Sequence, residues 1–114
     1  IVGISSVAGF RGLSSNPTYS ASKAALSNYM EGIRNDLAQH KISVTVLNPG
    51  FIDTPINKHR EFRPFLITPE KGAVIMANMI EKKVWSSTVP IWPWALISKI
   101  IQFMPERIWA KIGF

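Results

Sequence analysis

Two short apolar runs on either side of a long segment with helical periodicity constrain the fold most. The first run is residues 1–4. The second continues from Ile42 through Val44 and Val46 to Leu47, with polar residues alternating between them. A strand, a helix and a second strand in this order form a right-handed parallel crossover, so the sequence predicts an α/β fold with a parallel sheet. The helix is expected over residues 18–39, where apolar residues recur at the spacing of one packed face: Leu26, Met30, Ile33 and Leu37.

The segment after the second strand predicts a lid, a helix and a third strand. Prolines interrupt residues 50–67 and no period is visible, which is typical of a long functional loop with at most a short helix. Thr68 then provides a helix cap, with a proline and an acid behind it. We expect this helix to pack through Ala73, Met76, Ala77 and Ile80. Residues 87–92 predict a third strand, which Pro90 restricts to a sheet edge or a strand end.

The C-terminal part predicts an amphipathic helical tail over residues 94–114, set apart from a domain of residues 1–93. Lys99 is the only charge in residues 88–104, but Pro90 and Pro93 argue against a membrane span, as does a polar stripe at Ser98, Lys99 and Gln102. A short second helix is expected from Pro105 to Gly113, with Ile108, Trp109 and Ile112 on its apolar side. The tail tryptophans (Trp92, Trp94 and Trp109) fit three roles: packing on the protein's own cleft or core, a subunit contact, or a membrane surface.

Composition excludes several classes of function. The 114 residues contain no cysteine and two histidines, His40 and His59, so we expect no disulfide and no metal site. The net charge of +6 is spread along the chain, which argues against nucleic-acid binding. Its densest basic cluster, residues 58–63, is either a solvated loop or a place where Arg60 or Arg63 approaches an anionic substrate or a cofactor phosphate.

The first residues indicate a longer parent protein. The chain opens with Ile-Val-Gly-Ile-Ser-Ser, without an initiator methionine and without the charged and apolar regions of a secretory signal. We therefore expect the C-terminal part of a longer chain. The expected location is the cytoplasm, and the tail is a candidate for peripheral contact with a membrane.

The residues that carry chemistry gather at one edge of the predicted sheet. Tyr19 and Lys23 share a helix face because they are four residues apart. An ammonium group at that distance stabilises a phenolate, so Tyr19 could exchange a proton with a carbonyl or alcohol oxygen. Ser6 leaves the first strand thirteen positions earlier, and residues 48–54 leave the second strand at the same, carboxyl, end. Ligands of doubly wound folds bind at that end, so all three features point to one crevice.

Together these motifs resemble the C-terminal half of a short-chain dehydrogenase/reductase, a Rossmann-type family of NAD(P)-dependent oxidoreductases. The matching segments are Ser-Ser-Val-Ala-Gly at residues 5–9, Tyr-Ser-Ala-Ser-Lys at 19–23 and Pro-Gly-Phe-Ile-Asp-Thr at 49–54. They occur in the family's order and at its usual separations. The resemblance covers residues 1–54 closely and 55–83 in outline. It implies the C-terminal portion of a doubly wound parallel sheet, with three strands and crossover helices, followed by the helical tail.

The resemblance also implies roles for individual residues. Tyr19 would be the catalytic acid/base, Ser6 would donate a hydrogen bond to the reacting oxygen, and Lys23 would support Tyr19 and hold the nicotinamide ribose. Ser5 competes with Ser6 but is one residue too far from Tyr19. Around an NAD or NADP nicotinamide, Pro49 and Gly50 would shape the turn, Ile52 would offer backbone contacts, and Thr54 would offer its hydroxyl.

The implied activity is the interconversion of an alcohol and a ketone or aldehyde. Apolar residues of the loop and tail suggest a small hydrophobic substrate: Phe51, Phe62, Phe65, Leu66 and Trp92. The family commonly pairs through the helix that bears the tyrosine and lysine, so a homo-oligomer is expected for the parent. The family's Gly-rich dinucleotide motif, its Asn-Ala-Gly motif and its catalytic asparagine would precede residue 1, so these 114 residues alone should be inactive.

Two rival functions remain to be compared with this one. Gly3 and Ser5 resemble the start of the nucleophile elbow of a serine hydrolase, but Val7 stands where that motif needs glycine. The other rival is a noncatalytic membrane-associated or scaffolding protein that uses the Trp-rich tail.

Overall fold

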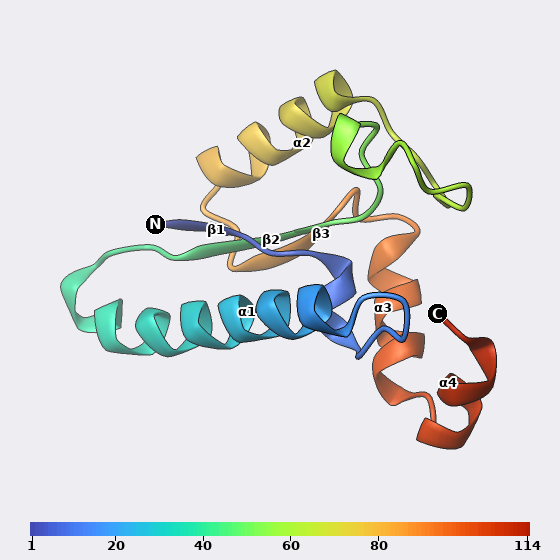
Figure 1. Cartoon of the computed structure of the whole chain (residues 1–114). Helices are drawn as coiled ribbons and strands as arrows, with labels where there is room; N and C mark the ends of the chain where they lie inside the picture. The colour runs from blue at the N-terminus through green and yellow to red at the C-terminus, as the bar shows by residue number, and fades with distance from the viewer.

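A three-stranded parallel sheet forms the centre of the protein. A computed structural model describes all residues, 1–114, and orders the strands β1 (Val2–Ile4), β2 (Thr45–Pro49) and β3 (Ser86–Val89) (Figure 1). Gly3 is opposite Val46, and Asn48 is opposite Thr88. The predicted parallel α/β fold is therefore confirmed.

The two long helices cover opposite faces of the sheet, as in a doubly wound fold. Helix α1 (Pro17–Leu37) lies below the sheet in Figure 1 and helix α2 (Pro69–Glu81) lies above it. Helices α3 (Trp94–Phe103) and α4 (Glu106–Ile112) form the predicted tail, beyond the carboxyl ends of the strands. Three short 3-10 helices complete the fold: η1 (Val7–Phe10), η2 (Ala38–His40) and η3 (Pro55–Asn57).

Both long helices begin where their capping residues predict. The Asn16 side chain accepts a hydrogen bond from the Tyr19 backbone N–H at 3.1 Å, and Thr68 accepts one from Lys71 at 3.2 Å. These caps satisfy backbone donors that have no partner inside the helix. The cap at Asn16 fixes the first turn of α1, which carries Tyr19.

The core consists of one cluster on each side of the sheet. On the side of α1, Met30 packs with Val44 and Val46, and the predicted face of the helix surrounds them. On the side of α2, Leu47 and Val89 pack with Met79. Because β2 contributes to both clusters, the middle strand holds the two layers together.

The second strand differs from its prediction. It begins at Thr45 rather than Ile42, and residues 44–48 are all buried instead of alternating. Ile42 lies outside the strand and is exposed. The reason is that helices cover both faces of a middle parallel strand, so polar residues such as Thr45 and Asn48 are buried as well.

Two further boundaries are corrected. The third strand spans Ser86–Val89 and ends before Pro90, rather than continuing to residue 92, and it lies at the sheet edge as Pro90 predicts. Helix α2 buries Gly72 and Met79, with Ile75 and Met76 packed beside Met79. Ala73, Ala77 and Ile80, which were predicted to pack, are exposed. The helix thus contacts β2 and β3 through a different stripe from the expected one.

The polar stripe predicted on the tail is also wrong in part. Ser98 is buried and donates its hydroxyl hydrogen bond to the Ala95 carbonyl at 3.1 Å. Lys99 and Gln102 are exposed as predicted, but Leu96, Ile100 and Phe103 are exposed on the same helix. None of the helices is long and apolar enough to cross a membrane.

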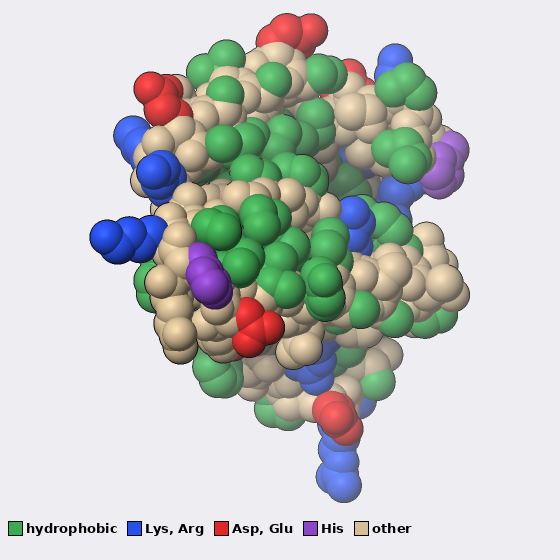
Figure 2. All heavy atoms as spheres, turned by 90° about the vertical axis from the view of Figure 1, so that its left-hand side faces the viewer, with side chains coloured by type: hydrophobic (Ala, Val, Ile, Leu, Met, Phe, Trp, Pro, Cys, Tyr) green, Lys and Arg blue, Asp and Glu red, His purple; other side chains and the backbone are tan.

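The free side of β1 is apolar. Val2 and Ile4 are exposed, whereas Gly3 between them packs against Met30. Figure 2 shows hydrophobic side chains gathered across the face that includes the N-terminal side of the molecule, with charged groups around them. An edge strand of this kind presents unpaired backbone groups to which another strand can bind.

Candidate active site

Two strand-end turns meet at the carboxyl edge of the sheet. The Ser5 backbone N–H donates to the Leu47 carbonyl at 2.8 Å, and the Gly50 N–H donates to the Val89 carbonyl at 3.0 Å. Ser6 and Phe51 follow immediately after these bonds. The structure therefore brings together the two turns that the sequence placed at one edge.

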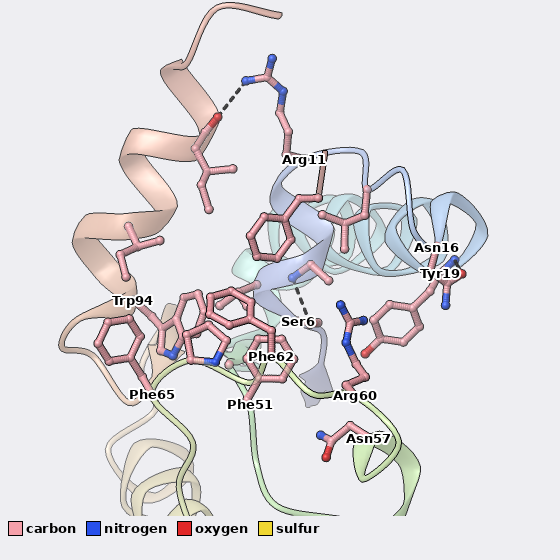
Figure 3. A pocket seen from close by; sticks show the side chains of 18 of the residues that line it. Ser6, Arg11, Asn16, Tyr19, Phe51, Asn57, Arg60, Phe62, Phe65 and Trp94 are labelled. Atoms are coloured by element: carbon pink, nitrogen blue, oxygen red, sulfur yellow. Dashed lines mark hydrogen bonds between the residues drawn. The ribbon is translucent and has the colours of Figure 1, made fainter. Parts of the chain in front are cut away.

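A pocket of about 510 Å³ opens at this edge (Figure 3). Ser6 and Tyr19 line it from the β1–α1 side, Gly50 from the turn after β2, and α3 and α4 close it from the tail. Most of its lining is hydrophobic. The aromatic residues around it are Tyr19, Phe51, Phe62, Phe65, Trp94, Trp109 and Phe114.

Ser6 and Tyr19 open onto the same space. Ser6 caps η1, where its Oγ accepts a hydrogen bond from the Ala8 backbone N–H at 3.0 Å. That contact uses the oxygen as acceptor and leaves the hydroxyl hydrogen free to donate. The Tyr19 hydroxyl makes no hydrogen bond within the protein, and the residue is 41% exposed. Both hydroxyls are thus available to a ligand oxygen in the pocket.

The neighbouring serine has a different role in the structure. Ser5 is buried, donates to the Lys23 carbonyl at 2.9 Å and lies 2.6 Å from the Ser27 Oγ. These bonds tie the end of β1 to the middle of α1. Ser5 does not line the pocket, whereas Ser6 does.

Lys23 stands behind Tyr19 rather than in the pocket. Its Nζ lies 5.8 Å from the centre of the Tyr19 ring and donates to the Ile4 carbonyl at 3.1 Å. One contact of this kind leaves two ammonium hydrogens free. Lys23 is therefore held between the end of β1 and the tyrosine, where its charge acts on the ring.

The loop from Gly50 to Ile67 is pinned at its base. The Asp53 backbone N–H donates to the Ile67 carbonyl at 2.9 Å, and the Ile67 N–H donates to the Phe51 carbonyl at 3.1 Å, which closes the loop. Inside it, Arg63 donates to the Asp53 carboxylate at 2.8 Å and to the Asn57 side chain at 3.2 Å. The predicted long loop with a short helix is confirmed, since η3 lies within this closed loop, and its role as a lid stays a prediction.

The residues after β2 include two hydrogen-bond donors without a partner in the protein, as the predicted nicotinamide contacts require. The Ile52 backbone N–H donates to no protein acceptor, and the Thr54 hydroxyl makes no hydrogen bond. Both groups are partly buried, and such donors are usually satisfied, so they can serve the carboxamide and neighbouring oxygens of a ligand. Pro49 ends β2, which fixes the start of this turn. Pro49, Ile52 and Thr54 do not line the apolar pocket itself, so the donors lie on a separate side of the site.

The tail supplies part of the pocket that motif reasoning missed. Trp94 is buried in the pocket wall, and Trp109 lines the pocket while its indole N–H donates to the Gly12 carbonyl at 2.7 Å. Trp92 is instead 73% exposed. Packing on the protein's own cleft, one of three roles considered, thus describes two of the three tryptophans. Leu66 and Trp92, expected at the substrate, do not line this pocket.

Other lining residues carried no motif signal. They are Asn16 at the start of α1, Asn57 at the end of η3, and His59 in the loop that follows. The apolar side of the tail could have indicated Ile97, Ile101 and Met104, because they share its helical spacing.

Fold and site together define an α/β protein with a ligand pocket at the carboxyl edge of a parallel sheet. Comparison with known proteins identifies its family. The family model of short chain dehydrogenases matches residues 1–63, more than half of the 114. The chain belongs to the short-chain dehydrogenase family.

Relatives in several bacteria agree with this assignment. An uncharacterized oxidoreductase of Myxococcus xanthus is 35% identical over 109 residues, which cover 95% of this chain and 43% of that protein. An uncharacterized oxidoreductase of Mycobacterium tuberculosis is 32% identical over 109 residues, which again cover 95% of this chain and 43% of that protein. The chain therefore spans less than half the length of these relatives.

A solved structure shares the fold over the whole chain. The crystal structure of a short chain dehydrogenase from Burkholderia cenocepacia, in complex with NADP, matches with a TM-score of 0.80 and 23% identity. The match covers 100% of this chain and 47% of that one.

Proposed function

We propose that the whole protein interconverts an alcohol and a ketone or aldehyde, with Tyr19 as the acid/base and NAD or NADP as the hydride carrier. The observation that supports this most is the shared pocket of Ser6 and Tyr19, with Lys23 directly behind the ring. NADP in the Burkholderia structure supports a nicotinamide dinucleotide here too.

The proposed chemistry gives a role in proton transfer to Ser6, Tyr19 and Lys23. In the reducing direction, a bound dinucleotide would supply the hydride that adds to the carbonyl carbon. The Ser6 hydroxyl donates a hydrogen bond to the carbonyl oxygen, and Tyr19 transfers its phenolic proton to that oxygen. Lys23 stabilises the phenolate left behind, and water returns the proton to Tyr19. In the oxidising direction the phenolate takes the proton of the alcohol.

The nicotinamide side of the site would be held by residues of two elements. We assign the ribose hydroxyls to Tyr19 and Lys23, and the carboxamide to the Ile52 N–H and the Thr54 hydroxyl. Pro49 and Gly50 shape the turn beneath it. These assignments are supported by donors without a partner in the protein: the Ile52 N–H, the Thr54 hydroxyl and two ammonium hydrogens of Lys23.

The direct test is Tyr19→Phe in the whole protein, with turnover of NADPH and NADH measured against a panel of apolar ketones. Loss of a general acid should lower kcat by about 10²- to 10⁴-fold. Tyr29→Phe is the matched control, since Tyr29 lies on the same helix outside the pocket. Unchanged turnover in Tyr19→Phe would refute the proposed acid/base.

We also propose that residues 1–114 alone do not turn over, because the rest of the dinucleotide site belongs to the remaining length of the whole protein. Hydride transfer by residues 1–114 should stay at background. Appreciable activity would contradict this proposal.

A second proposed role concerns the outer face of α3, formed by Leu96, Ile100 and Phe103. Phe103 is 81% exposed, and Lys99 lies on the same helix. An apolar face with a basic residue beside it suits an anionic lipid surface. Phe103→Ser should reduce co-sedimentation of the whole protein with phosphatidylglycerol vesicles, whereas Val74→Ser, at an exposed site on α2, should not. Equal sedimentation of all three proteins would contradict this role.

For the assembly we propose a homo-oligomer that pairs through α1. Tyr29 is 66% exposed on this helix, and aromatic residues are enriched in subunit interfaces. Tyr29→Lys should halve the mass seen by light scattering, and an unchanged mass would argue against pairing there.

A further inference from the structure

We propose that Arg60 binds a carboxylate of the substrate, so that the substrate is an oxo or hydroxy acid with an apolar body. This inference rests on the proposed function and names the substrate class for the same pocket.

Arg60 is a cation without a partner. It lines the pocket and is partly buried, and its guanidinium carbon lies 5.7 Å above the centre of the Phe51 ring. Its side chain makes no hydrogen bond or ion pair. Stacking on Phe51 holds the guanidinium in place and leaves its N–H donors free.

The two other arginines near the pocket each use their Nη1 in contacts within the protein. Arg63 is paired with Asp53 at 2.8 Å. Arg11 donates to the carbonyls of Ile101 and Met104 and stacks on Trp109. Arg60 is therefore the arginine of the pocket whose whole guanidinium is free to bind an anionic ligand.

The charge of the pocket favours an anion. Arg11 and Arg60 line it, and no aspartate or glutamate does. A cation with low exposure and no counter-charge is costly to keep, and a bound carboxylate offsets that cost with two parallel hydrogen bonds.

The arrangement in the pocket suggests how such a substrate would lie. In Figure 3, Arg60 and Tyr19 approach from one side, whereas Trp94 and Phe65 stand on the other. The far wall continues into apolar side chains of the tail: Ile97, Ile101, Met104 and Trp109. A molecule with a carboxylate at Arg60 and an apolar chain against the tail matches both sides, and an alcohol or ketone without a charge matches only one.

The test uses decanoate and 1-decanol as probes, with binding to the whole protein followed by calorimetry. These probes share an alkyl chain and differ in charge. Arg60→Met should weaken decanoate binding by about 10- to 100-fold and leave decanol binding nearly unchanged. Lys58→Met is the matched control, because Lys58 is an exposed cation of the same loop outside the pocket. Its decanoate affinity should equal that of the unmodified protein.

Two outcomes would overturn the proposal. One is decanoate binding by Arg60→Met that equals that of the unmodified protein. The other is a loss of NADPH and NADH affinity in Arg60→Met with decanoate affinity retained, which would assign Arg60 to the dinucleotide diphosphate. Because decanoate binding requires no turnover, its failure is distinguishable from a failure of Tyr19 as acid/base.

Discussion

Gly50 lies directly against the indole ring of Trp94. A Cβ on Gly50 would overlap the indole nitrogen and would lie 2.8 Å from Cδ1. Trp94 in turn meets Phe65 edge-on, with ring centres 5.9 Å apart. The turn after β2 and the first residue of α3 therefore form one wall of the pocket, and that wall requires a residue without a side chain.

Gly50→Ala should lower the free energy of unfolding by about 1–3 kcal/mol, because the added methyl group forces the buried indole to move. Chemical denaturation of the whole protein measures this, and near-ultraviolet circular dichroism reports the tryptophan. The matched control is Gly12→Ala, since a Cβ there meets nothing within 4 Å. Equal stability of the two variants would show that Trp94 does not occupy the space above Gly50.

Arg11 should anchor the tail. Its guanidinium donates to the carbonyls of Ile101 at 2.8 Å and Met104 at 2.6 Å, and it stacks on Trp109. Arg11→Met removes both charged hydrogen bonds, so hydrogen exchange over residues 94–114 should accelerate by about 10-fold or more. Arg107→Met is the control, because Arg107 is exposed and makes no such bonds. Exchange at the same rate in both variants would contradict an anchoring role.

The two adjacent serines should separate stability from activity. Ser5→Ala removes buried hydrogen bonds between β1 and α1 and should destabilise the protein by about 1–3 kcal/mol while largely sparing kcat. Ser6→Ala should do the opposite, lowering kcat by about 10- to 1000-fold with little change in stability. Thermal unfolding and steady-state kinetics on both variants provide the comparison. A larger loss of kcat in Ser5→Ala would reverse the proposed roles.

Much of the fold could be predicted because local patterns determine it. The caps at Asn16 and Thr68 give the starts of both long helices, and the packed face of α1 follows its periodicity. The start of β2 could not be predicted, because helices on both faces bury its polar residues and remove the alternation. The prediction of the packed face of α2 was wrong for a related reason, because the side of an apolar helix that packs depends on the sheet beneath it.

In the site, too, local motifs predicted some residues, whereas long-range contacts determine the others. Short motifs brought Ser6, Tyr19 and Gly50 to one pocket, since strand ends of a parallel sheet converge. The wall from α3 and α4 could not be predicted, because its contacts join residues about ninety positions apart, as from Arg11 to Ile101 and Met104. Ser98 illustrates the limit of periodicity, because a small hydroxyl that bonds its own helix can be buried as readily as an apolar residue.

The central claim is that Ser6 and Tyr19 act on one substrate oxygen, and a double-mutant cycle in kcat tests it most directly. If both hydroxyls serve the same oxygen, the whole protein carrying Ser6→Ala and Tyr19→Phe should be about as slow as Tyr19→Phe alone, because residues that act as a unit are not additive. Independent losses that multiply in the double variant would place the two hydroxyls on different atoms and contradict the claim.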